Sequence, residues 1–134
     1  MEETIFHKIL AGEIPAHKVY EDEHVLAFLD IFPLAKGHTL VVPKVFGETL
    51  LDLSAETISS LWQGVQHATK KIKEVLSPEG FTFGVNHGEV AGQSVPYVHV
   101  HIIPRWADDN GGSMHSIVKN PPSESIEEIA ALFT

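Results

Sequence analysis

Short runs of apolar and β-branched residues recur along the chain, and polar or turn-forming residues separate them. The polar segment 21–24 predicts a hairpin between the first two runs, and Pro43 predicts the end of the third. The five predicted strands comprise residues 19–20, 25–29, 38–42, 81–86 and 98–104. Their spacing indicates an antiparallel sheet of about five strands.

Between the third and fourth runs the apolar spacing becomes helical. Ser54 is a candidate N-cap for a long helix, which we expect Pro78 and Gly80 to end. The apolar face of this helix consists of Ile58, Leu61, Trp62, Val65, Ile72, Val75 and Leu76. Short helices are predicted at residues 4–11 and after a capping box that begins at Ser125. The predicted fold class is α+β, with the long helix covering one face of the sheet.

Composition limits the classes of function. The chain has 134 residues, which suits a single domain over residues 1–134, and it has no cysteine, which excludes disulfides, thiolate nucleophiles and Cys-containing zinc sites. A net charge of -9 opposes binding to nucleic acid or to an anionic membrane. The acidic N-terminus is followed by no long apolar run, so we expect no signal peptide, no transmembrane segment and a cytoplasmic protein.

Two histidines stand out in the last predicted strand. Strict alternation in residues 98–104 puts His99 and His101 on one face, where they could bind a metal or act as catalytic groups near neutral pH. The preceding loop contains Gly92, Gln93 and Ser94, whose backbone, amide and hydroxyl groups could bind an anion. Because no cysteine or nearby carboxylate completes a ligand set, the pattern favours catalysis over a metal site.

Gly92-Gln93-Ser94 followed by alternating histidine and apolar residues resembles the signature of the histidine triad proteins. The Hint-type nucleoside phosphoramidases and their bacterial relatives are the most similar branch. The resemblance continues through residues 4–15, 27–31 and 37–44 and covers roughly residues 4–106, which leaves 107–134 as a C-terminal extension. Its motifs occur in the expected order, which makes the resemblance more specific than a lone His-x-His.

The resemblance implies a double displacement on a nucleotide. His99 would attack the α-phosphorus, His101 would donate to a phosphoryl oxygen or the leaving group, and His38 would support them. Ser94, Gln93 and backbone N–H groups would stabilise the charge that develops on phosphorus, so no metal or other cofactor is required. The physiological substrate, a phosphoramidate or a dinucleoside polyphosphate, stays open.

The resemblance also implies a purine nucleotide as ligand and a homodimer as the assembly. Asp30 would accept hydrogen bonds from the ribose hydroxyls, although an aspartate before Pro33 is also a common turn residue. Asn86 and Gly92 would contact the sugar or the phosphate. The slot for the base would consist of Ile5, Phe6, Ile9, Phe28 and Ile31, which periodicity alone assigns to the core.

Tyr97 stands where the family has the first histidine of its triad. The expected nucleophile His99 is still present, and residue 97 still has a backbone carbonyl to orient it. The substitution leaves open an alternative, a nucleotide-binding or regulatory module with weakened catalysis. A third hypothesis is a zinc-binding structural protein. Some relatives carry a Cys-x-x-Cys zinc pair, but this chain has Thr4 and His7 there, so we expect no structural zinc.

Overall fold

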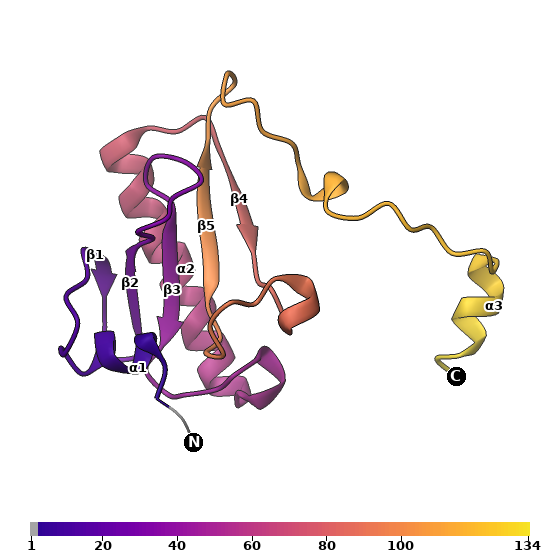
Figure 1. The fold of residues 1–134 in the computed structure, drawn as a ribbon, viewed down its shortest axis with the longest axis horizontal. Helices are drawn as coiled ribbons and strands as arrows, with labels where there is room; N and C mark the ends of the chain where they lie inside the picture. Colours follow the sequence, from indigo (N-terminus) through magenta and orange to yellow (C-terminus); the bar gives the residue numbers. More distant parts are fainter. Residues whose placement is uncertain (1–2) are drawn as a thin grey trace.

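The computed structural model describes residues 3–134 and contains one five-stranded antiparallel sheet (Figure 1). The strand order is β1-β2-β3-β5-β4, so the last strand in the sequence lies inside the sheet. The strands are β1 (Lys18–Glu21), β2 (Val25–Leu29), β3 (Thr39–Pro43), β4 (Gly80–Gly84) and β5 (Val100–Arg105). The predicted α+β class, with a hairpin between the first two strands, is confirmed.

The long helix α2 (Ala55–Leu76) begins where the sequence predicts, because the Ser54 side chain accepts a hydrogen bond from the Thr57 backbone. The residue that ends α2 differs from the prediction, which names Pro78 and Gly80. The helix stops at Ser77, which adopts the left-handed conformation with φ 51°, and Gly80 is already the first residue of β4. Pro78 follows this cap and does not itself end the helix.

Helix α2 packs on one face of the sheet and closes it. The helix and sheet residues buried between them are Val25, Ala27, Val41, Leu61, Val65, Ala68, Ile72, Val100 and Ile102. Gly64 allows this close packing, since a Cβ there would lie 2.4 Å from a Val25 methyl group. The opposite face is partly covered by the short helix α1 (Ile5–Leu10), and a second apolar cluster that includes Phe6, Phe28 and Tyr97 fills that contact.

The loop between β4 and β5 is longer than predicted. Strand β4 ends at Gly84 and β5 begins at Val100, whereas the apolar alternation extends to residues 86 and 98. The reason is a change of hydrogen-bond partner, because the Val98 backbone N–H donates to Gly47 in another loop. This longer loop contains a single 3-10 turn, Glu89–Ala91, and leads to His99 and His101.

Residues 107–134 form an arm that leaves the sheet and extends beyond the β4 side of the body (Figure 1). The arm contains a 3-10 turn, Met114–Ser116, and helix α3 (Ile126–Ala131), where the predicted capping box at Ser125 is present. Its apolar side chains are exposed, among them Ile117 at 76% and Phe133 at 85%. Within residues 3–134, no helix is both long enough and apolar enough to cross a membrane.

Candidate active site

The alternation of β5 produces the predicted arrangement of the two histidines. Val100 and Ile102 are buried toward α2, whereas His101 lies on the opposite face. The ring of His99, immediately before the strand, lies 5.0 Å from that of His101, measured between ring centroids. His99 is buried and His101 is half-buried, so both imidazoles are held in a partly desolvated site.

The hydrogen bond of His99 determines which of its nitrogens is free. Nδ1 lies 2.7 Å from the backbone carbonyl of Tyr97, and a carbonyl can only accept, so Nδ1 carries the hydrogen. Nε2 of the neutral ring therefore keeps its lone pair. Residue 97 contributes its carbonyl to this contact, which is why a tyrosine there preserves the orientation of the ring.

A second chain of hydrogen bonds links His38 to His101. The Leu34 backbone N–H donates to Nδ1 of His38 at 3.1 Å, so the hydrogen of neutral His38 is on Nε2. That nitrogen lies 3.0 Å from Nδ1 of His101, which must accept. The hydrogen of neutral His101 is therefore on Nε2, and His101 is a donor toward the site.

Burial keeps these imidazoles neutral in the free protein. It lowers the pKa of His38 and of His99 from the ordinary value of 6.5. The pKa of His101 falls to about 4, mainly through burial and further through the neighbouring His99 and His38. Asp30 acts in the opposite direction on all three, and its Oδ2 lies 3.6 Å from Nε2 of His38.

A cavity of about 390 Å³ opens beside His99 and gathers most of the predicted binding residues. Its lining includes Ile5, Phe6, Ile9, Phe28, Asp30, Ile31, Ser94, His99 and His101. The Phe6 ring contacts the His99 ring edge-on, at 5.0 Å between centroids. The exposed residues His17 and Phe32, which the sequence pattern does not assign to the site, also line this cavity.

Asp30 is a turn residue, as the sequence allows, and its side chain also lines the cavity. Its Oδ1 accepts a hydrogen bond of 2.9 Å from the Phe32 backbone, as expected of a turn residue. Its Oδ2 lies near His38, and the side chain lines the cavity. The turn thus fixes one carboxylate oxygen and leaves the other facing the site.

The side chain of Gln93 differs from its predicted role as an anion-binding donor. Its Nε2 donates to the carbonyl oxygens of Glu48 and Val95, at 2.7 and 3.1 Å, and its Oε1 accepts from the Gly88 backbone. The amide therefore braces the loop. Sequence spacing places Gln93 beside the site but does not reveal these backbone partners.

Gly92 and Asn86 also lie apart from the cavity that contains Asp30. Gly92 ends the 3-10 turn of the loop with φ 104°, a conformation that favours glycine. Asn86 packs beside it and lines a second cavity, which it shares with His101. The predicted contact of Asn86 with the nucleotide is therefore on the far side of His101 from the apolar slot.

Two groups of side chains include atoms that could bind a metal ion. Ligand atoms of Asp30, His38 and His101 all lie within 4.8 Å of one another, but the facing nitrogens of the two histidines are already joined by a hydrogen bond that a cation would have to break. At the N-terminus, Nδ1 of His7 is bonded to Thr4, and the rings of Phe46 and Tyr97 pack against the imidazole. Neither arrangement fits a tetrahedral zinc site.

Comparison with known proteins identifies the family to which this chain belongs. The family model described as HIT domain matches residues 11–108. The chain belongs to the HIT family. The histidine triad resemblance of the sequence is thereby confirmed, with relatives in the Hint-like branch.

Three proteins of this family illustrate the similarity. Protein hit of Bacillus subtilis is 47% identical over 110 residues, which are 82% of this chain and 76% of that protein. Adenosine 5'-monophosphoramidase of Schizosaccharomyces pombe is 40% identical over 107 residues, or 80% and 77% of the two chains. A HIT family protein from Bacillus anthracis, whose crystal structure is known, has 40% sequence identity to this chain. The two structures align with a TM-score of 0.86, and the alignment covers 98% of this chain and 93% of that chain.

Proposed function

We propose that this HIT protein is a nucleotide hydrolase that cleaves the P–N bond of purine nucleoside phosphoramidates, or a related nucleotidyl P–O bond, through a nucleotidyl-histidine intermediate. The observation that carries the proposal is the free Nε2 of His99 beside an apolar cavity that also contains Asp30. The relative named as an adenosine 5'-monophosphoramidase supports this reaction class. The direct test is release of AMP from adenosine 5'-phosphoramidate in the presence of EDTA.

The first chemical step forms a bond between Nε2 of His99 and phosphorus while the P–N bond breaks. The amine leaves with the bonding electron pair and takes one proton from Nε2 of His101, which can donate it once the His38–His101 pair has gained a proton from solvent. The anionic substrate raises the affinity of the His38–His101 pair for that proton, because a nearby negative charge favours the imidazolium. The hydroxyl of Ser94 and loop backbone N–H groups would stabilise the phosphoryl oxygens.

Water completes the reaction. Its oxygen bonds to phosphorus, the bond from phosphorus to Nε2 of His99 breaks, and the imidazole regains its lone pair. The proton that water loses replaces the one given to the amine, so the sum is phosphoramidate plus water to amine plus nucleoside monophosphate. No step requires a metal ion.

The alternative function is a nucleotide-binding or regulatory module in which Tyr97 has weakened catalysis and left nucleotide binding intact. One observation weighs against it, because the phenol of Tyr97 points away from the site and donates to the carbonyl oxygen of Pro43. Only the backbone carbonyl of Tyr97 meets His99. Nucleotide binding by the wild-type protein without any phosphoramidate or dinucleoside polyphosphate hydrolysis would favour the module.

We expect the ribose to bind Asp30, and removal of the carboxylate tests this. Asp30→Ala should raise KM for adenosine 5'-phosphoramidate roughly 10-fold or more, because hydrogen bonds to a charged group are lost. With a 2',3'-dideoxy substrate, which lacks the ribose hydroxyls, the KM of Asp30→Ala should be close to that of the wild-type protein. Asp30→Asn is the control, since its amide oxygen can still accept from Phe32. An equal KM increase with both substrates would contradict the ribose contact.

The pH dependence of kcat/KM should report the titration of His99. Protonation of Nε2 removes the nucleophilic lone pair, so the rate falls as pH decreases through the pKa of the free enzyme. Since burial lowers that pKa below 6.5, we expect the acidic limb below pH 6.5. A pH profile from 4 to 8 measures it, and an acidic midpoint above 6.5 would mean that another group controls the rate.

The homodimer stays a prediction of the family resemblance. The exposed Leu132 and Phe133 at the C-terminal end of the arm give it physical support, because exposed apolar surfaces commonly mark protein contacts. Sedimentation equilibrium at micromolar concentration would test it, and a monomeric mass would contradict it.

A further inference from the structure

A second cavity, of about 610 Å³, lies on the other side of His101 from the apolar slot. It extends along β4 and β5 and includes Asn86, Ile103 and Arg105. Its outer wall comes from the arm, through Met114 and Ile117. Because His101 lines both cavities, a phosphorus atom in reach of the histidines would stand where the two spaces meet.

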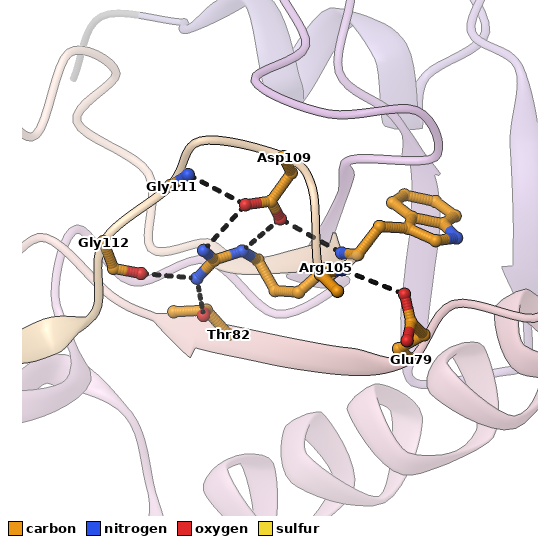
Figure 2. A network of polar contacts seen from close by, with 8 residues as sticks. Glu79, Thr82, Arg105, Asp109, Gly111 and Gly112 are labelled. Atoms are coloured by element: carbon orange, nitrogen blue, oxygen red, sulfur yellow. Dashed lines mark hydrogen bonds and ion pairs between the residues drawn. The ribbon is translucent and has the colours of Figure 1, made fainter.

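Polar contacts of Arg105 form a clasp at the base of the arm (Figure 2). Arg105 donates to both carboxylate oxygens of Asp109, at 2.7 and 3.1 Å, and to the carbonyl oxygen of Gly112 at 2.7 Å. The remaining contacts tie the clasp to β4 through Thr82 and close the turn through the backbone of Gly111. The arm therefore leaves the sheet along a fixed direction that carries its next turn over the cavity.

The same clasp occupies the guanidinium of Arg105, which is the permanent cation among the described residues that line the second cavity. The guanidinium of Arg105 lowers the pKa of the Asp109 carboxyl far below its usual range, so the two charges neutralise each other near neutral pH. Arg105 directs Nε, Nη1 and Nη2 to partners within the protein. Much of the remaining wall is aliphatic or aromatic, including Leu34, Phe83, Val85, Ile103, Met114 and Ile117.

We propose that this second cavity binds the leaving group and selects an uncharged, apolar amine. The inference rests on the proposed function and adds a substrate class to it. The leaving group must depart on the side of phosphorus opposite the nucleophile His99. With the nucleoside in the first cavity, the leaving group would therefore extend past His101 into the second cavity. Apart from His101, a polyphosphate there would meet no free cation among the described lining residues, because Arg105 is paired with Asp109, whereas an aryl or alkyl group would bury apolar surface.

The test compares adenosine 5'-phosphoramidate with its N-benzyl derivative. Wild-type kcat/KM should be roughly 10-fold or more higher for the benzyl substrate, as expected when an apolar pocket is filled. Ile117→Asp should abolish that ratio. Ile126→Asp is the matched control, because Ile117 and Ile126 are similarly exposed, at 76% and 74%, and only Ile117 lines the cavity. Equal rates for the two substrates, or a higher rate with diadenosine polyphosphates, would overturn the proposal.

Binding measurements separate this proposal from the proposed function. Calorimetry with the His99→Ala protein gives the Kd of AMP and of the uncleaved N-benzyl phosphoramidate. Tighter binding of the benzyl compound that Ile117→Asp removes supports the cavity even if the wild-type protein hydrolyses nothing. Hydrolysis of both substrates with no benzyl preference in either assay supports the hydrolase and overturns the apolar leaving-group site.

Discussion

His99→Ala is expected to reduce kcat for adenosine 5'-phosphoramidate by about 10³-fold or more, the scale seen when a covalent nucleophile is removed. The reason is local geometry. The Tyr97 carbonyl holds the hydrogen of His99 on Nδ1 and leaves Nε2 free, whereas the neighbouring His101 carries its hydrogen on Nε2. AMP release with EDTA measures the effect, and intact-protein mass spectrometry at alkaline pH should detect a nucleotidyl adduct on the wild type alone.

His24→Ala is the matched control for this variant. His24 is an exposed histidine in the β1–β2 turn and does not line either cavity beside His101, so its removal should leave kcat within a factor of about 2, as for surface substitutions. AMP binding by both variants, measured by calorimetry, tests whether the site is still folded. Full activity in His99→Ala would rule out the nucleotidyl-histidine mechanism.

The periodicity of the sequence was sufficient to predict the sheet, the long helix and the shared face of His99 and His101. These features depend on local spacing and on which side chains must be buried, and both can be seen in a single sequence. The slot around Phe6 and Phe28 could be predicted only because the family resemblance links residues far apart in the chain. Its residues come from α1, β2 and the loop before β5, which periodicity cannot bring together.

Other features depend on partners that spacing does not show. The hydrogen bond between His38 and His101 joins residues that are 63 positions apart. The amide of Gln93 reaches the carbonyl of Glu48, so a residue that looks like an anion donor becomes a loop brace. The second cavity has part of its wall from the arm, whose base Arg105 holds through hydrogen bonds to Asp109 and Gly112. An Arg–Asp pair at this spacing in the sequence does not by itself indicate a cavity wall.

Tyr97 shows how the chain stabilises the region around His7. Its ring is 1% exposed and packs against Phe6, His7 and Phe46, with ring centroids 4.9 to 6.1 Å apart. Its hydroxyl donates to the Pro43 carbonyl at 2.5 Å, and burial raises the pKa of the phenol to about 12, so it stays neutral. An aromatic cluster thus connects α1, the end of β3 and the strand entry that orients His99.

Tyr97→Ala should therefore lower the free energy of unfolding by about 3–5 kcal/mol, the usual cost of truncating a large buried aromatic residue. Tyr97→Phe keeps the ring and loses only the bond to Pro43, so about 1 kcal/mol is expected. Urea unfolding followed by circular dichroism measures both, with and without EDTA. Because the cluster is built from rings and not from metal ligands, EDTA should not change the wild-type midpoint. A chelator-dependent midpoint, or a Tyr97→Ala loss below about 1 kcal/mol, would show that something other than aromatic packing stabilises this region.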